Sequence, residues 1–282
     1  MKVFEKVSEL QEHLNDLTKS GKSVGFVPTM GALHQGHVSL VTRCVAENDV
    51  CVVSIFVNPI QFNNPEDLHN YPRTIDKDLE LLEKTGCDVV FAPTESEVYP
   101  KPDTRVFDLG FLDTVMEGKQ RPGHFQGVAK VVSRLFEIVK PHNAYFGEKD
   151  FQQIAVIRHM VNLVGLSVNI VSCPILREAD GLALSSRNLL LTPDHRKNAP
   201  LIAKTLLEAR NKKAQMSVKE LTKWVVDQIN ANPYLEVEYF EIANAKTFEI
   251  LSNWQPNEVA VGCITVKAGK VRLIDNVMFD PK

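Results

Sequence analysis

Short apolar runs alternate with longer amphipathic stretches through the first two-thirds of the chain. Segments 23–29 (SVGFVPT) and 49–57 (DVCVVSIFV) are apolar and rich in β-branched residues, as is typical of strands buried on both faces. Segment 73–86 is amphipathic and ends at a glycine, which predicts a helix. Further strand patterns lie at 88–93, 144–147 and 167–174, and further helical patterns lie at 127–141 and 151–165. Repeated β-α-β units predict an α/β fold, a Rossmann-like parallel sheet with helices on both faces.

The segment before the first long strand predicts a helix and contains a misleading motif. Ser8 and Gln11 have the spacing of a capping box, and Gly21 marks the helix end. The string GKS at 21–23 is similar to the end of a phosphate-binding P-loop, but Asp16 stands where that motif needs a glycine. A P-loop also follows a strand, whereas this string follows a helix. We therefore interpret it as a helix-terminating turn.

The pattern changes near residue 176. A polar, loop-like stretch is followed by two predicted helices, one from Thr192 and one from Ser217, with Glu220 completing a capping box. Three strand patterns then end the chain, and the last two are joined by KAGK, which predicts an antiparallel hairpin. We expect two domains, a Rossmann-like domain at 1–176 and a smaller C-terminal α+β domain at 177–282.

Composition narrows the functional classes. The 282 residues carry a net charge of −3, so no basic field indicates nucleic-acid binding. No apolar run has the length of a membrane helix, and the N-terminus has no signal-peptide pattern. The five cysteines are scattered without a CxxC pair, which favours a reducing, cytoplasmic location.

Segment 27–41 (VPTMGALHQGHVSLV) is the clearest candidate for chemistry. His34 and His37 follow a predicted parallel strand, at or near the start of a helix. Open α/β sheets bind ligands there, and a helix N-terminus offers unpaired N–H groups suited to phosphate. A zinc site would need a third ligand, and zinc-binding pairs are more often four residues apart. Phosphate binding is favoured over a metal site, and the question of proton transfer stays open.

Six segments together resemble one known family. PTMGALHQGH is similar to the HxGH signature of the nucleotidylyltransferase superfamily, which is related to the HIGH motif of class I aminoacyl-tRNA synthetases. The ordered set PTMGALHQGH, SIFVNPIQF, YPRT, RPGHFQGVAKVV, YFGEKDFQQ and READGLALSSRN resembles the pantoate–β-alanine ligases over almost the whole chain. The resemblance implies that pantoate attacks the α-phosphorus of ATP. β-Alanine then attacks the resulting pantoyl adenylate, releasing AMP.

The resemblance also assigns roles to individual residues. It implies that His37, His34 and Lys149 act in catalysis, with Lys149 supplying a cation and Asp150 bonding the ribose. The implied ATP-binding residues are Met30, Gly31, Ala32, Leu33, His34, Gln35, Gly36, His37, Gly147, Glu148, Lys149, Asp150, Leu176, Leu184, Ser185, Ser186 and Arg187. The loop from Leu184 corresponds to the KMSKS-type loop of related enzymes, on a domain that closes as a lid.

Two glutamines are expected to bind substrate. The resemblance places Gln61 and Gln153 on pantoate, and Gln61 also on β-alanine; the neighbouring Gln152 is expected to point elsewhere. Additional pocket-wall candidates are Asn58, Tyr71, Arg121 and His124. Mg²⁺ is expected with ATP, held mainly by phosphates. Asp78 is a possible metal ligand, although its helix is expected to expose it. The resemblance implies a homodimer.

Other functional classes stay open at this point. A nucleotidyltransferase that releases its adenylylated product carries the same HxGH segment, and so could a nucleotide-binding regulator without catalysis. The set of His, Lys, Gln, Ser and Arg groups argues against the regulator. A tRNA synthetase is disfavoured because the chain leaves little room for anticodon recognition.

Overall fold

The structure is a computed structural model that describes residues 1–62 and 65–281. The chain forms two units: unit 1 comprises Met1–Glu148 and Gln152–Pro174, and unit 2 comprises Lys149–Phe151 and Ile175–Lys282. The two domains expected at 1–176 and 177–282 remain a prediction, separate from this division into units. Each unit is described by itself.

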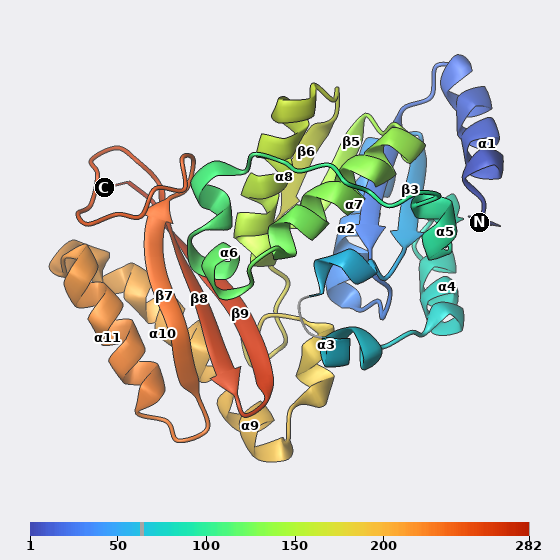
Figure 1. The fold of residues 1–282 in the computed structure, drawn as a ribbon. Coiled ribbons are helices and arrows are strands. Elements are labelled where there is room, and N and C mark those ends of the chain that lie inside the picture. Colours follow the sequence, from blue (N-terminus) through green and yellow to red (C-terminus); the bar gives the residue numbers. More distant parts are fainter. Residues whose placement is uncertain (63–64, 282) are drawn as a thin grey trace. The chain divides into compact units, whose positions relative to one another are not determined.

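Unit 1 is built on a parallel sheet in which the strand order reverses (Figure 1). The order across the sheet is β1 (Lys2–Phe4), β4 (Val89–Phe91), β3 (Val50–Ile55), β2 (Val24–Thr29), β5 (Asn143–Gly147) and β6 (Asn169–Cys173). The chain leaves β2 for β3 and β4 on one side and later enters β5 on the other. The carboxyl end of β2 is therefore the topological switch point, where such sheets bind ligands.

Helices cover both faces of this sheet. On one face α2 (Gln35–Glu47) and α4 (Ile75–Glu83) bury Leu40 and Leu82 against the strands. On the other face Phe136 of α7 (His124–Val139) meets Phe26 of β2 edge to face, with ring centroids 6.2 Å apart. The remaining helices with residues in unit 1 are α1 (Val7–Lys19), α3 (Pro65–His69), α5 (Glu95–Val98), α6 (Met116–Gln120) and α8 (Phe151–Val164).

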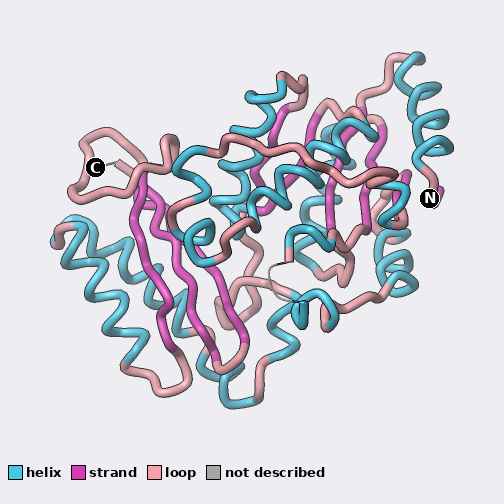
Figure 2. The backbone as a smooth tube through the Cα atoms, in the orientation of Figure 1, coloured by secondary structure: helices cyan, strands magenta, loops and turns pink. Residues whose placement is uncertain are grey.

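Unit 2 is a three-stranded antiparallel sheet with helices packed on it (Figure 2). Its strands are β7 (Glu236–Asn244), β8 (Ala260–Ala268) and β9 (Val271–Phe279), and its helices are α9 (Pro193–Asn198), α10 (Leu201–Lys212) and α11 (Val218–Asn230). Leu206 of α10 and Val225 of α11 join Ile264 of β8 in one apolar core. The β8–β9 turn is the predicted hairpin, and Gly269 adopts a positive φ of 63° there.

The predicted fold class is confirmed, and two local predictions are wrong. The first helix begins at Val7, so Ser8 lies inside it and forms no capping box with Gln11. The Glu97 carboxylate accepts the Val7 N–H at 2.9 Å instead. The helix predicted from Thr192 is two helices, α9 and α10, because Pro200 interrupts the run. Within the described part of the chain, every helix is too short or too polar to cross a membrane.

Candidate active site

The segment that follows β2 makes a tight loop at the switch point. Gly31 and Ala32 both adopt positive φ, 79° and 50°. The Thr29 hydroxyl accepts the Gly31 N–H at 3.2 Å and donates to the Ser54 carbonyl at 2.7 Å, which ties the loop to β3. The sharp turn delivers His34 to the start of α2, as the sequence predicted.

Asp78 holds this loop from α4. Its carboxylate accepts the Ala32 N–H at 2.9 Å and the Leu33 N–H at 2.8 Å, and the Thr74 hydroxyl donates to it at 3.2 Å. The Asp78 residue is only 2% exposed, so the expectation of an exposed position is wrong. The helix is amphipathic as expected, but Asp78 faces the loop because the loop offers it two backbone donors.

The geometry of Asp78 does not suit a role as a metal ligand. Both of its oxygens accept backbone N–H groups, which leaves the carboxylate committed to the loop. In the described residues, no group of three or more His, Cys, Asp or Glu side chains could hold a metal ion. The residues here therefore offer no carboxylate cage for Mg²⁺, and the metal role of Asp78 stays a prediction that this geometry disfavours.

The two histidines of the HQGH segment are arranged as a pair. Nδ1 of His34 accepts the Gly36 N–H at 3.1 Å, and Nδ1 of His37 accepts the His34 N–H at 3.3 Å. Their ring centroids lie 4.1 Å apart, and both side chains are half-buried. Because a backbone N–H can only donate, each Nδ1 is unprotonated, and the proton of each neutral ring is on Nε2.

Gln61 is fixed by its side chain and its backbone. It lies in a short 3₁₀ turn after β3, Pro59–Gln61. Its Oε1 accepts from Asn58 Nδ2 at 3.1 Å, and its Nε2 lies 3.0 Å from Met30 Sδ. The carboxyl ends of β2 and β3 thus bring Gln61 against the first residue of the predicted ATP loop. The proposed pantoate-binding and ATP-binding residues of unit 1 are neighbours.

The RPGHFQG segment packs against Gln61 and hydrogen-bonds its backbone carbonyl. Arg121 Nη1 lies 3.0 Å from His124 Nε2, and His124 Nδ1 lies 2.9 Å from the Gln61 carbonyl. A guanidinium only donates, so Nε2 of His124 accepts and its Nδ1–H donates to the carbonyl. A Cβ on Gly127 would lie 2.5 Å from Gln61 Cα, so this close approach needs glycine.

Gln152 and Gln153 have different surroundings. Gln152 is 5% exposed, and its amide nitrogen donates to the carbonyls of Leu112 and Val115 at 2.9 and 3.0 Å. Its Oε1 accepts the Glu117 N–H at 3.0 Å. Gln152 therefore holds the loop around α6, and Gln153, which is half-buried, remains the glutamine predicted to bind substrate.

Unit 2 carries its own group of polar candidates. Lys149 belongs to this unit, and its ammonium pairs with the Asp150 carboxylate at 3.1 Å. Lys149, Ser185 and Arg187 line one small pocket together with Arg272. Ser185 caps the 3₁₀ turn Ser186–Leu190, where its hydroxyl accepts the Arg187 N–H at 3.3 Å.

Two residues of β9, Asp275 and Asn276, hold the segments that carry these candidates. Asp275 is 4% exposed, and its carboxylate accepts a bidentate hydrogen bond from the Arg177 guanidinium at 2.7 and 2.9 Å. Arg177 also donates to the Gly181 carbonyl at 3.1 Å. The side chain of Asn276 donates to the Lys149 carbonyl at 3.2 Å. Adjacent residues of one strand therefore hold both the Lys149 segment and the start of the loop that leads to Arg187.

Comparison with known proteins identifies the family. Residues 2–278 match the family model described as pantoate-beta-alanine ligase. The pantothenate synthetase of Porphyromonas gingivalis W83 is 55% identical over 280 residues, 99% of this chain and 100% of the relative. The chain belongs to the pantoate–β-alanine ligase family. The predicted enzyme class, an ATP-using carbon–nitrogen ligase that forms pantothenate through pantoyl adenylate, is confirmed.

Solved structures of pantoate–β-alanine ligases share this fold. The enzyme from Thermus thermophilus superposes with a TM-score of 0.93 at 45% identity, with 100% of both chains covered. The ligase from Francisella tularensis, complexed with beta-gamma ATP and beta-alanine, has a TM-score of 0.81 at 36% identity and covers 99% of this chain and 97% of its own.

The residues that position the candidate site residues are not evident from the sequence. The sequence suggests Asp78 only as a metal ligand and does not indicate a role for Arg177, Asp275 or Asn276. The contacts between Asp78 and Leu33, Asp275 and Arg177, and Asn276 and Lys149 span 45, 98 and 127 residues, and no local spacing reveals such contacts. Gly127, which packs against Gln61, does have a local signal, because it lies three residues after the candidate His124 in the motif RPGHFQG.

Proposed function

We propose that the HQGH loop and Gln61 of unit 1 carry the first half of the ligase reaction, in which pantoate carboxylate attacks the α-phosphorus of ATP. The observation that supports this most is the imidazole pair at the switch point, with both Nδ1 atoms bonded to backbone N–H groups. Each ring then presents an Nε2–H donor. Such preorganised donors stabilise phosphate charge as it shifts toward the leaving pyrophosphate.

This arrangement favours hydrogen-bond donation over proton transfer. A neutral imidazole that carries its proton on Nε2 is a good donor but a weak acid, since Nδ1 would need to be protonated to form imidazolium. We propose that His34 and His37 stabilise the departing pyrophosphate without protonating it. Loss of either ring removes transition-state stabilisation, so kcat is affected more than substrate affinity.

Gln61 and Gln153 are proposed to bind pantoate. Neutral amides can hydrogen-bond hydroxyl groups and a carboxylate without neutralising the nucleophile. The commitment of the Gln152 amide to the α6 region supports the choice of Gln153. The pantoate oxygen becomes the bridge to AMP. When the β-alanine amine attacks the acyl carbon, that oxygen leaves with AMP and the amine loses a proton.

Unit 2 is proposed to bind the phosphates of ATP and to act as a lid domain. The residues proposed to contact the phosphates are Lys149, Ser185, Ser186 and Arg187. The pocket lined by Lys149, Ser185 and Arg187 supports this, because it gathers ammonium, hydroxyl and guanidinium donors that suit phosphate oxygens. The proposed ATP contacts of Leu176 and Leu184 are consistent with the hydrogen bond from the Leu184 N–H to the Leu176 carbonyl at 3.0 Å, which holds the two segments together.

Three broader features are also proposed. Mg²⁺ would accompany ATP and be held mainly by its phosphates, since both oxygens of Asp78 already accept backbone N–H groups; when bound it would neutralise phosphate charge. All five cysteines are buried thiols, which supports a reducing, cytoplasmic location. A homodimer is proposed from family membership, and light scattering tests it.

The reaction is tested by omission of one substrate at a time. With pantoate, β-alanine and Mg-ATP, we expect pantothenate, AMP and pyrophosphate in equal amounts. Without β-alanine, we expect about one pyrophosphate per active site and then a stall, because the adenylate stays bound. Continued pyrophosphate release without the amine would instead identify a nucleotidyltransferase that frees its adenylylated product.

A further inference from the structure

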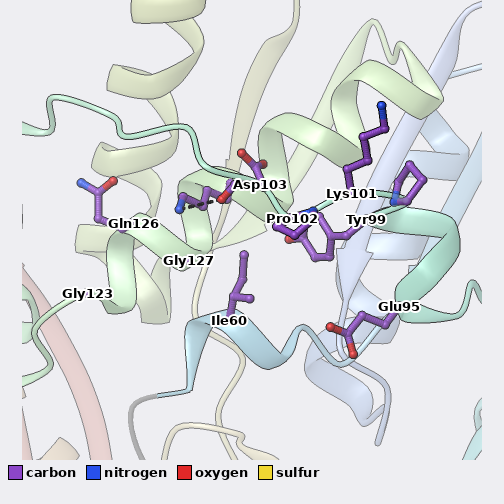
Figure 3. A pocket seen from close by; sticks show the side chains of 11 residues that line it. Ile60, Glu95, Tyr99, Lys101, Pro102, Asp103, Gly123, Gln126 and Gly127 are labelled. Atoms are coloured by element: carbon purple, nitrogen blue, oxygen red, sulfur yellow. Dashed lines mark hydrogen bonds between the residues drawn. The ribbon is translucent and has the colours of Figure 1, made fainter.

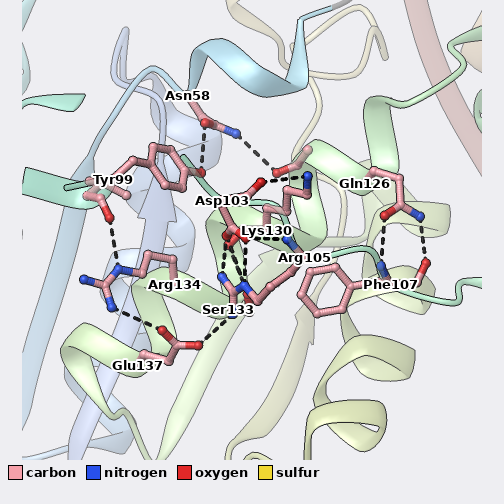
Figure 4. Close-up of polar contacts among 12 residues, drawn as sticks. Asn58, Tyr99, Asp103, Arg105, Phe107, Gln126, Lys130, Ser133, Arg134 and Glu137 are labelled. Atoms are coloured by element: carbon pink, nitrogen blue, oxygen red, sulfur yellow. Dashed lines mark hydrogen bonds and ion pairs between the residues drawn. The ribbon is translucent and has the colours of Figure 1, made fainter. Parts of the chain in front are cut away.

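Tyr99 is connected through Asn58 to Gln61, the glutamine proposed to bind pantoate. It follows helix α5 and forms part of the wall of a cavity of about 440 Å³ that Ile60 and Gly127 also line (Figure 3). Ile60 precedes Gln61 directly, and Gly127 packs against Gln61 Cα. The Tyr99 hydroxyl donates to Asn58 Oδ1 at 3.1 Å (Figure 4).

Both polar atoms of the Asn58 side chain, Nδ2 and Oδ1, have hydrogen-bond partners. Asn58 is 1% exposed, and its Nδ2 donates both to Gln61 Oε1 at 3.1 Å and to the Gly127 carbonyl at 3.2 Å. A carbonyl only accepts, so the amide nitrogen has to face Gly127, and Oδ1 has to face Tyr99. The hydroxyl of Tyr99 therefore acts as the donor that completes one orientation of the Asn58 amide.

That orientation determines which end of Gln61 is available. With Oε1 accepting from Asn58, the Gln61 amide nitrogen points to Met30 Sδ at 3.0 Å. A thioether is a weak acceptor, so an oxygen atom of a substrate can replace it at little cost. Gln61 thus presents N–H donors, which match the hydroxyl and carboxylate oxygens of pantoate.

We propose that Tyr99 is a positioning residue for pantoate binding, which acts through Asn58 to hold the Gln61 amide so that its nitrogen, and not its oxygen, faces the Met30 sulfur and can donate to substrate in its place. The inference rests on the proposed role of Gln61 in binding pantoate. The Tyr99 hydroxyl is protonated and able to donate at neutral pH, and burial raises its pKa further above the ordinary value.

The first test is Tyr99→Phe, which removes one oxygen atom and keeps the ring. One neutral hydrogen bond corresponds to about a three- to tenfold effect, so we expect the KM for pantoate to rise by about that factor. The KM for ATP is expected to change less than about twofold. Tyr145→Phe is the matched control, because it removes a hydroxyl that bonds Asn48 and Glu47 in the same unit.

Two further variants separate this inference from the role of Gln61 itself. Gln61→Ala is expected to raise the KM for pantoate more than Tyr99→Phe does, and Tyr99→Phe in that background should add no further increase. Asn58→Asp replaces the donor facing Gln61 Oε1 with an acceptor, so it should exceed the effect of Tyr99→Phe; it also serves if Tyr99→Phe does not fold.

The outcomes are distinguishable. An unchanged KM for pantoate in Gln61→Ala would reject the proposed role of Gln61. A raised KM in Gln61→Ala together with an unchanged KM in folded Tyr99→Phe would overturn only the positioning role of Tyr99. Equal increases for pantoate and ATP in Tyr99→Phe, or the same increase for pantoate in Tyr145→Phe, would indicate a purely structural effect and would also overturn it.

Discussion

Asp78→Asn separates the two interpretations of this carboxylate, a support for the ATP loop or a metal ligand. Asparagine keeps the volume, but it replaces one of the two carboxylate oxygens, each of which now accepts one backbone N–H at 2.9 or 2.8 Å, with an NH₂ group. Its amide nitrogen then faces the other N–H, from Ala32 or Leu33. The substitution therefore removes one charge-assisted hydrogen bond, makes the other a neutral one, and leaves a donor without its acceptor.

The magnitude follows from these contacts. A hydrogen bond to a charged group contributes about 1.5–3 kcal/mol, so a loss of about 2 kcal/mol is expected at this buried site. That energy corresponds to a factor of about 30 in an equilibrium constant. We expect the free energy of unfolding to fall by about 2 kcal/mol and kcat/KM for ATP to fall by about 10- to 30-fold, because the loop that carries His34 loses its support.

Urea unfolding and steady-state kinetics at several Mg²⁺ concentrations provide the assay. Asp76→Asn is the matched control: it lies in the same helical turn but is exposed, so a change within about 0.5 kcal/mol is expected. An Asp78→Asn enzyme of unchanged stability, whose full activity returns at high Mg²⁺, would refute the support role and favour a metal ligand.

Three further predictions concern the same unit. His37→Ala is expected to lower kcat by about 100-fold with little change in the KM for ATP, measured by steady-state kinetics; a change in KM alone would reject its role in the transition state. Gln153→Ala should raise the KM for pantoate, whereas Gln152→Ala should lower the thermal unfolding temperature, and the reverse result would reassign the pair. The Arg105 guanidinium holds the pKa of Asp103 below its usual range, so this pair adds stability above about pH 4 that is lost as the pH falls. Arg105→Met should therefore lower the unfolding temperature at neutral pH, and the difference should shrink as the pH falls below the usual pKa of an aspartate, about 3.9, and through the lowered pKa of Asp103.

The strands and the HQGH loop could be predicted because their signals are local. The β-branched runs of β2 and β3 appear in the structure as parallel strands, and the loop between β2 and α2 lies at the switch point. The capping box at Ser217 and Glu220 also forms as predicted, since both partners lie within one helical turn.

The wrong or missing predictions involve partners far away in the sequence. Ser8 has the spacing of a cap, but Glu97, 90 residues after Val7, accepts the N–H at the helix start. Asp78 looked exposed because helix periodicity does not show that a loop 45 residues earlier will supply two donors. Asn276 supports Lys149 across 127 residues. Such contacts depend on the topology of the fold, which local pattern does not contain.

Transfer of ¹⁸O tests the central claim most directly. Pantoate labelled with ¹⁸O in its carboxylate is turned over with β-alanine and Mg-ATP, and the products are examined by mass spectrometry and ³¹P NMR. Attack on the α-phosphorus, as proposed for the HQGH loop and Gln61, predicts that each AMP carries one labelled oxygen from pantoate and that pyrophosphate carries none. Label in inorganic phosphate, or pantothenate formed with unlabelled AMP, would contradict the account.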